Sequence, residues 1–465
     1  MGSEGFHRGR NRPVGVDLFA GVGGLALGFE QAGFDVVAAV EQDPVHAAVH
    51  RFNFPLTTVI CGDVGKIAAA RVLEAARLGF IAHGGVVEDW TGEIDVVFGG
   101  PPCQGFSTIG RRDAGDDRNR LVYRFADLVG AIQPRYFVME NVPGMAVIGS
   151  SGILTRLINR FRSYGYQVAV NAQDAVQRAI LRAADFGVPQ DRRRLFLIGG
   201  REGERLPMYP LPTVTPAAKR RDRGGTTAPR LFDELPLGPT VWDAIGDLPD
   251  LDSFEQLRTS DEVRLTKREF ERMAVAASPY VRILRCVTND PEDFGYPRVW
   301  DPRILTSSLR TEHTTRSVAR FRRTQEGNTE PVSRFYRLDR SGLCNTLRAG
   351  TGRDFGAYTS ARPLHPILPR VISVREAARL HSFPDWFRVH RTKWHGFRSI
   401  GNAVPPFLSR AIAKAIREAI GGKVAAPDHQ VMLGDPGFLR IKPKDAVQLF
   451  ALNGTTLGPG VRTEE

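Results

Sequence analysis

Short apolar runs alternate with amphipathic stretches along residues 14–200. Runs rich in branched and aromatic side chains predict strands at Val14–Leu18, Asp35–Val40, Thr57–Cys61, Ile94–Phe98, Tyr136–Met139, Gln167–Val170 and Leu195–Ile198. Apolar residues at helical spacing predict helices at Leu25–Gln31, Ile67–Leu78, Val122–Ile132 and Leu154–Tyr164. This alternation predicts an α/β fold with an open, largely parallel sheet that is covered by helices on both faces.

The pattern changes near residue 205. Prolines become frequent between 207 and 239, the alternation fades and arginines increase, which indicates a second region of loops and short elements up to about residue 340. A helical pattern returns at Val374–Leu380, and another helix is expected from near Pro405 to Ile420. Residues 422–465 are weakly patterned and predict no particular element.

Length and charge narrow the class of protein. A chain of 465 residues suits roughly two domains rather than one core. The formal net charge is +12, and residues 341–465 hold 18 basic against 9 acidic residues, which favours a polyanionic partner. No apolar run reaches the roughly 18 residues of a membrane span, and the N-terminus lacks the apolar core of a signal peptide, so a cytoplasmic protein is expected.

A glycine-rich turn over residues 17–24 follows the first predicted strand. Glycines at a strand-to-helix turn let a ligand approach the backbone. The pattern Gly21-x-Gly23-x-x-Ala fits a permissive dinucleotide fingerprint, and Glu41 stands where a ribose-binding acid would lie. Glu41 and Asp63 each follow a predicted strand at the same sheet edge. The turn therefore predicts a nucleoside-containing cofactor, with a ligand-free turn as the alternative.

The segment Gly-Gly-Pro-Pro-Cys-Gln-Gly-Phe-Ser at 99–107 follows the fourth predicted strand. The four cysteines of the chain form no Cys-x-x-Cys pair, so neither a zinc site nor a disulfide framework is expected. A lone cysteine is usually inert. Cys103, however, leaves a sheet edge on a turn made rigid by two prolines, beside the expected cofactor site, and this context suits a nucleophilic thiolate.

Two further segments place charged residues at predicted strand ends. Glu140 ends the fifth strand, at the sheet edge where such folds bind ligands, although a solvated or capping glutamate is the alternative. Gln190, Arg192 and Arg194 alternate along an extended segment and are expected to share one face. Two guanidinium groups on one face need an acidic or carbonyl-rich partner; a solvated basic strand end is the alternative.

Together these segments resemble the cytosine-5 DNA methyltransferase family in its bacterial, restriction–modification form. The order matches: the glycine turn, Pro-Pro-Cys-Gln, Glu-Asn-Val, Gln-x-Arg-x-Arg, a variable stretch, Arg-Glu-Ala-Ala-Arg-Leu-His-Ser-Phe-Pro at 375–384 and Gly-Asn-Ala-Val-Pro at 401–405. The resemblance covers roughly residues 14–200 and 341–420. Two departures are a longer segment between Asp63 and Ile94, expected to add a helix, and His381, which stands where glutamine is common. Neither departure is expected to touch the chemistry.

The resemblance implies a Rossmann-like, S-adenosylmethionine-dependent methyltransferase domain with a smaller target-recognition domain. We expect a disordered basic tail over 1–12, a catalytic domain over 13–204, target recognition over 205–340, a return to the catalytic domain over 341–422, and a C-terminal extension over 423–465. In that family fold the C-terminal segment packs beside the first strand, and the helix after Asn402 suits that role.

The resemblance also implies roles for individual residues. Cys103 would attack carbon 6 of cytosine, Glu140 would protonate ring nitrogen 3, and Arg192 and Arg194 would lie near the base oxygen and the cysteine. S-adenosylmethionine would be bound by Phe19, Gly21, Gly23, Glu41, Asp63, Pro101, Leu121 and Asn402. Duplex DNA with a flipped-out base would be contacted by Gln104, Ser107, Arg111, Arg112, Arg316, Arg320, Arg322 and Arg323. No metal is expected.

Three other functions fit parts of this sequence. A transfer RNA cytosine-5 methyltransferase would carry the same motifs, although the long arginine-bearing segment 201–340 favours DNA. A dinucleotide-dependent oxidoreductase would explain the glycine turn and Glu41 but not Cys103, Arg192 and Arg194. A catalytically idle DNA-binding protein is the third alternative, and the intact Cys103, Glu140, Arg192 and Arg194 argue against it. The expected partners are double-stranded DNA and, functionally, a cognate restriction endonuclease or defence system, and the expected state is a monomer.

Overall fold

The computed structural model describes residues 12–102, 120–147, 152–217, 235–350 and 362–452. Five of the predicted site residues, Cys103, Gln104, Ser107, Arg111 and Arg112, lie outside these ranges.

An eight-stranded sheet forms the centre of one half of the molecule, in the order β3-β2-β1-β4-β5-β9-β6, with β7 also paired to β9. The strands are β1 (Val14–Leu18), β2 (Asp35–Glu41), β3 (Thr58–Cys61), β4 (Val96–Gly99), β5 (Tyr136–Asn141), β6 (Tyr166–Val168), β7 (Ile180–Arg182) and β9 (Arg193–Arg201). The first five strands run parallel, whereas β9 is antiparallel to β5, β6 and β7. The predicted α/β fold with a largely parallel sheet is therefore confirmed, and its antiparallel side comes from β6, β7 and β9.

Helices cover both faces of this sheet, which is why the parallel strands can be apolar throughout. One face is packed by α1 (Gly24–Gln31), α2 (Pro44–Asn53) and α14 (Pro406–Ile420). The other face is packed by α3 (Ala69–Ala82), α4 (Arg120–Ile132) and α6 (Ile153–Ser163). The short helices α5 (Gly144–Val147) and α7 (Ala175–Arg178) lie in the connections. The additional helix expected between Asp63 and Ile94 is α3.

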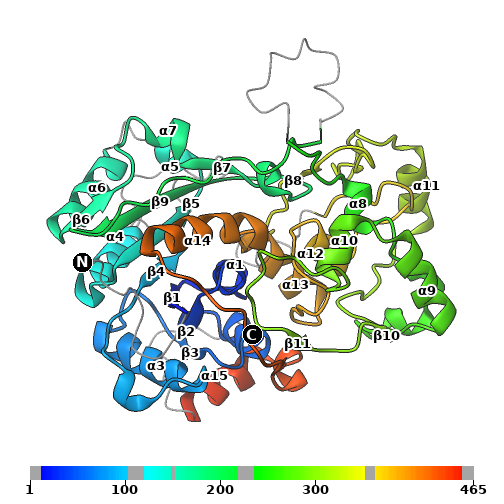
Figure 1. Cartoon of the computed structure of the whole chain (residues 1–465). Coiled ribbons are helices and arrows are strands. Elements are labelled where there is room, and N and C mark those ends of the chain that lie inside the picture. The colour runs from blue at the N-terminus through cyan, green and yellow to red at the C-terminus, as the bar shows by residue number, and fades with distance from the viewer. Residues whose placement is uncertain (1–11, 103–119, 148–151, 218–234, 351–361, 453–465) are drawn as a thin grey trace.

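Helix α14 lies along α1, although the two are almost 400 residues apart in the sequence (Figure 1). Gly28 on α1 permits this close packing, because a Cβ there would lie 2.3 Å from the Cβ of Ser409. The Ser409 hydroxyl donates a 2.8 Å hydrogen bond to the carbonyl of Leu25. Helix α14 thus completes the apolar cover of this face of the sheet.

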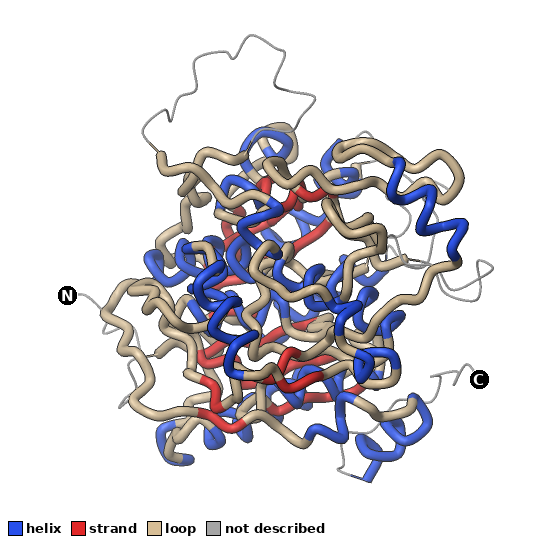
Figure 2. The backbone as a smooth tube through the Cα atoms, turned by 90° about the vertical axis from the view of Figure 1, so that its right-hand side faces the viewer, coloured by secondary structure: helices blue, strands red, loops and turns tan. Residues whose placement is uncertain are grey.

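The middle of the chain is built from short elements that lie beside the sheet, on the right of Figure 1. They are α8 (Val241–Ile245), α9 (Lys267–Ala276), α10 (Pro279–Leu284), α11 (Thr315–Arg323), β10 (Val263–Arg264), β11 (Arg298–Val299) and β12 (Ile304–Leu305). Figure 2 views the molecule from this side, where loops predominate over helices and strands. The proline-rich, weakly periodic sequence of this region agrees with that irregular backbone.

The chain then returns to the sheet. Strand β13 (Cys344–Asn345) pairs in parallel with β8 (Gln190–Asp191), which directly precedes β9. Helices α12 (Val374–Arg379) and α13 (Lys393–Asn402) follow, close to the predicted helical pattern at 374–380. The arrangement brings residues near 347, 381 and 401–403 against the segment 190–192. How the chain divides into domains stays a prediction.

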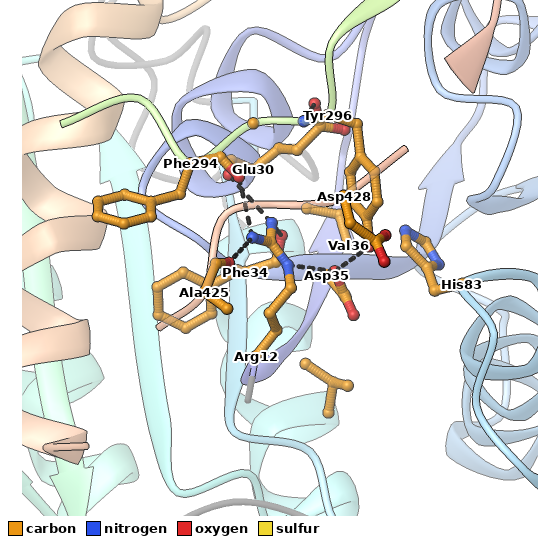
Figure 3. A network of polar contacts seen from close by, with 12 residues as sticks. Arg12, Glu30, Phe34, Asp35, Val36, His83, Phe294, Tyr296, Ala425 and Asp428 are labelled. Carbon is orange, nitrogen blue, oxygen red and sulfur yellow. Dashed lines mark hydrogen bonds and ion pairs between the residues drawn. The ribbon is translucent and has the colours of Figure 1, made fainter. Parts of the chain in front are cut away.

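A buried polar network joins the amino-terminal edge of the sheet to distant segments of the chain (Figure 3). The Arg12 guanidinium lies 2.8 Å from Asp35 and donates to the carbonyl oxygens of Phe294 and Ala425. Asp35 also accepts a 2.8 Å hydrogen bond from the Tyr296 hydroxyl. Arg12, placed in the disordered tail by the sequence, is only 7% exposed, so this position of the expected tail is part of the folded structure.

The C-terminal region has more structure than its sequence pattern predicts. Strand β14 (Val431–Met432) pairs with β11, and α15 (Pro443–Leu452) packs against α2. Phe450 of α15 is fully buried in a small cluster with Ala20, Ala39 and Cys61. None of the helices in the described ranges has the length and apolar character needed to cross a membrane.

Candidate active site at the carboxyl edge of the sheet

The carboxyl ends of β1 to β5 meet at one edge of the sheet, because these strands are parallel and adjacent. The glycine turn follows β1, Glu41 ends β2, Asp63 follows β3, Gly100 and Pro101 follow β4, and Glu140 lies near the end of β5. The topology therefore brings these sequence-predicted residues together, and β9 adds Arg194 beside β5.

The turn after β1 has the backbone geometry of a ligand-binding loop. Phe19 has φ 63°, a left-handed conformation that costs a non-glycine residue about 1 kcal/mol or more. Gly21 and Gly23 have φ 54° and 99°. A Cβ at Gly21 would meet no atom of the described structure within 4 Å, so open space borders the backbone at this point. Strain next to open space is typical of a functional turn rather than of a packed connection.

Glu41 stabilises the turn after β1 through hydrogen bonds to backbone amides. One of its carboxylate oxygens accepts a 2.7 Å hydrogen bond from the Gly21 amide, and the other accepts a 2.7 Å bond from the Asp43 amide. Asp63 accepts from the Gly65 amide at 2.8 Å, and a Cβ at Gly65 would lie 3.5 Å from Leu121. Asn402 ends α13 and is exposed.

Asp17 is a polar residue of this edge that the sequence reading did not assign. It lies in β1 with no exposed surface, and its carboxylate oxygens make no hydrogen bond of normal geometry within the described residues. Burial, followed by the nearby charge of Glu41, raises the pKa of Asp17 well above its usual range. The sequence signal that could have identified Asp17 was a single acidic residue inside the otherwise apolar strand Val-Gly-Val-Asp-Leu. The open space at Gly21 and this unsatisfied acid fit a polar cofactor bound at the turn.

Gly100, Pro101 and Asn141 fix the start of the Pro-Pro-Cys-Gln segment. The Asn141 side chain donates a 3.1 Å hydrogen bond to the Pro101 carbonyl. A Cβ at Gly100 would lie 2.7 Å from a carboxylate oxygen of Glu140, so a side chain here would displace the Glu140 carboxylate. Residues 101 and 102 therefore leave the sheet directly beside Glu140, and the described chain stops immediately before Cys103.

Glu140 and Arg194 form an ion pair across β5 and β9, with 2.8 Å between a carboxylate oxygen and Nε. Their side chains are 13% and 15% exposed. Burial raises the pKa of Glu140 above its usual range, although the charges of Arg194 and Arg192 act in the opposite direction. A carboxyl group with a raised pKa beside a cation can hold and release a proton nearer neutrality.

Arg192 is more deeply buried than the sequence pattern suggested. It is 1% exposed and donates to the backbone carbonyls of Leu347, Gly401 and Ala403 at 2.9–3.0 Å. These carbonyls and Glu140 are the carbonyl-rich and acidic partners expected for the two guanidinium groups, so the solvated alternative for Arg192 is wrong. Its Nε has no hydrogen-bond partner in the described ranges.

The predicted DNA-contacting arginines within the described chain lie on α11, far along the sequence from the sheet. Arg316, Arg322 and Arg323 are exposed. Arg320 instead pairs with the buried Glu330, with 3.1 Å between Nε and a carboxylate oxygen, so part of its charge is used inside the protein. Within the described residues, no group of histidine, cysteine, aspartate and glutamate has the arrangement of a metal site.

His381, expected to stand apart from the chemistry, contacts the segment that carries Arg192. Its ring has no exposed surface and contacts Gln190 and the carbonyl of Ala403, which also accepts from Arg192. The departure from glutamine at position 381 was the one signal of this contact in the sequence.

Comparisons with known proteins agree with this geometry. Residues 14–418 match the family described as C-5 cytosine-specific DNA methylase. The type II methyltransferase M.XorII of Xanthomonas oryzae pv. oryzae is 46% identical over 96% of this chain and 94% of its own length. M.AgeI of Thalassovita gelatinovora is 31% identical over 87% of this chain and 99% of its own. A solved prophage-encoded E. coli protein, described as a DNA modification methyltransferase, has a TM-score of 0.60 at 32% identity and covers 87% of this chain and 98% of its own.

Proposed function

Because the chain belongs to the C-5 cytosine-specific DNA methylase family and is a DNA (cytosine-5)-methyltransferase, we propose that it acts through a covalent adduct between Cys103 and a cytosine flipped out of duplex DNA. The observation that carries this proposal is the partly buried Glu140–Arg194 pair, which lies beside the Gly100–Pro101 turn that leads into Cys103.

Each residue has a distinct task in this reaction. The Cys103 thiolate adds to carbon 6 of the ring, and Glu140 donates a proton to ring nitrogen 3, which relieves the negative charge created by the addition. Arg194 holds the Glu140 carboxyl in place, and the free Nε of Arg192 supplies positive potential nearby. Carbon 5 then becomes nucleophilic. After methylation the carbon 5 proton passes to water and the proton on ring nitrogen 3 returns to Glu140. The carbon 5–carbon 6 double bond re-forms and expels the Cys103 thiolate.

We propose S-adenosylmethionine as the cofactor. It supplies an electrophilic methyl group when bound. Open space at Gly21 and the buried, unsatisfied Asp17 support a cofactor site at the turn after β1. The residues proposed to hold it are Phe19, Gly21, Gly23, Glu41, Asp63, Pro101, Leu121 and Asn402.

We propose that residues 205–340 recognise the target. The exposed Arg316, Arg322 and Arg323 on α11 would contact phosphates, together with Gln104, Ser107, Arg111 and Arg112, which lie outside the described residues. Arg320 is a weaker candidate, since Glu330 already binds it. The type II methyltransferases among the relatives support a role in protecting host DNA alongside a restriction endonuclease. A cytoplasmic location and a monomeric state stay predictions.

Methyl transfer to purified duplex DNA and to transfer RNA, followed by bisulfite sequencing of DNA from expressing cells, tests this function. The expected result is 5-methylcytosine at one recurring duplex site and no uptake by transfer RNA. Methyl uptake by transfer RNA alone would overturn the choice of DNA as substrate. If the enzyme methylates ordinary duplex DNA but forms no covalent complex with DNA that contains 5-fluorocytosine, the Cys103 mechanism is overturned.

A further inference from the structure

We infer that His381 is a positioning residue for methyl transfer, which holds the Gln190–Arg192 segment in register with the loop at 401–403. The inference rests on the role proposed for Arg192. It begins from the ring itself, which is fully buried at the end of α12 and stacks beside Phe383 with 5.9 Å between ring centroids.

Both ring nitrogens of His381 are engaged. Nε2 lies 2.9 Å from the carbonyl oxygen of Ala403, and Nδ1 lies 2.8 Å from the side-chain nitrogen of Gln190. A carbonyl can only accept, so Nε2 carries the proton. Nδ1 must then accept from the Gln190 amide. The partners fix one neutral tautomer, and burial together with the charge of Arg192 lowers the pKa of His381 well below its usual value.

The Gln190 amide cannot turn around to suit another ring state. Its nitrogen also donates to the Leu380 carbonyl at 3.2 Å, and its oxygen accepts from the Leu347 amide at 3.1 Å. Reversing the amide would place like groups against each other at both positions. The position at 381 therefore requires one acceptor toward Gln190 and one donor toward Ala403.

This requirement connects His381 to Arg192 along two routes. The Ala403 carbonyl accepts from His381 and from Arg192, each at 2.9 Å. The backbone amide of Arg192 also donates to the Gln190 carbonyl at 3.0 Å, so Gln190 and Arg192 belong to one tight turn. Displacing the His381 ring would disturb its contact with the Gln190 side chain and its contact with the Ala403 carbonyl, which Arg192 shares. The charge of Arg192 acts on Glu140, so the displacement would reach the proposed acid.

A glutamine satisfies the same two bonds, because its amide offers one acceptor and one donor. His381→Gln is therefore the matched conservative variant. His381→Phe keeps an aromatic ring next to Phe383 but leaves the Gln190 amide nitrogen without its ring partner and the Ala403 carbonyl with one donor. Unsatisfied buried polar groups of this kind shift to find partners.

Steady-state kinetics with duplex DNA, calorimetric binding of S-adenosylmethionine and thermal unfolding of the full chain test the inference. For His381→Phe we expect kcat to fall roughly 10- to 100-fold, because small misplacements of reacting groups have effects of that size. The Kd for S-adenosylmethionine should change less than about threefold, since the bond from Arg192 to the Gly401 carbonyl, beside Asn402, does not involve His381. His381→Gln should restore kcat to within about twofold.

A wild-type kcat in folded His381→Phe would overturn the inference, as would a loss that His381→Gln does not restore. If His381→Phe does not fold, His381→Asn replaces it, because asparagine carries the same donor and acceptor on a side chain one methylene shorter. A wild-type kcat for that variant would equally overturn the inference. Arg192→Lys separates the two proposals: if it keeps the wild-type kcat, the role of Arg192 fails, whereas if only His381→Phe is unimpaired, the role of His381 alone fails.

Discussion

The two edges of the central sheet differ in how completely their buried polar groups are satisfied. At the amino edge, Arg12, Glu30 and Arg298 place their charges against partners from distant segments, with 2.8 Å between the Arg298 guanidinium and Glu30. At the carboxyl edge, Asp17 and the Nε of Arg192 have no hydrogen-bond partner in the described ranges, and Phe19 has a strained backbone. Paired charges join segments at the amino edge, whereas unsatisfied groups and strain at the carboxyl edge fit the cofactor and substrate site proposed there.

The largest effect should come from Cys103→Ser, at the carboxyl edge. The serine hydroxyl is a far weaker nucleophile than a thiolate, so methyl transfer should fall by at least roughly 10⁴-fold. DNA binding, measured by fluorescence anisotropy, should stay within a few-fold of wild type. Transfer of labelled methyl at the wild-type rate would remove Cys103 from the mechanism.

Glu140→Gln should lower kcat by roughly 10³-fold, because a glutamine amide cannot act as an acid that transfers a proton to ring nitrogen 3. The folded structure should persist, since a neutral amide can still accept from Arg194. Single-turnover methyl transfer measures the chemical step directly. A rate equal to wild type would show that the raised pKa of Glu140 has no part in the reaction.

Arg298→Met tests the amino edge. It leaves Glu30 buried without its cation, so the free energy of unfolding should fall by about 3 kcal/mol, with kcat of the folded enzyme close to wild type. Arg264→Met is the matched control, because its pair with Asp301 is exposed and should contribute less than about 1 kcal/mol. Urea unfolding measures both. A large loss of kcat in folded Arg298→Met would contradict the division of tasks between the edges.

The smallest effect is expected for Gly21→Ala. The side chain would enter the open space at the turn and would strain a left-handed backbone, so S-adenosylmethionine should bind roughly tenfold more weakly. Gly84→Ala is the control, since Gly84 has φ 85° and equally open surroundings in a different turn. Calorimetry should show a change in Kd only for Gly21→Ala. Equal affinities for both variants would place the cofactor elsewhere.

Periodicity and the order of the motifs predicted most of the sheet and the residues gathered at its carboxyl edge. The direction of β9 was not predictable, because a strand's apolar pattern is the same in either orientation. Helix α2 was missed because His46, His50 and Asn53 are polar yet buried, which hides its apolar face. The three-residue strand β7 is too short for a periodic signal. The contacts of His381 depend on long-range packing, which sequence spacing does not contain.

The position of α14 on α1 has a consequence for how the protein is made. Leu25 and Phe29 on α1 belong to the same buried cluster as Leu408 and Ile412, so one face of the sheet has its full cover only after the ribosome has added residues 406–420. During translation that apolar face stays exposed to water and to chaperones until residues 406–420 have emerged from the ribosome.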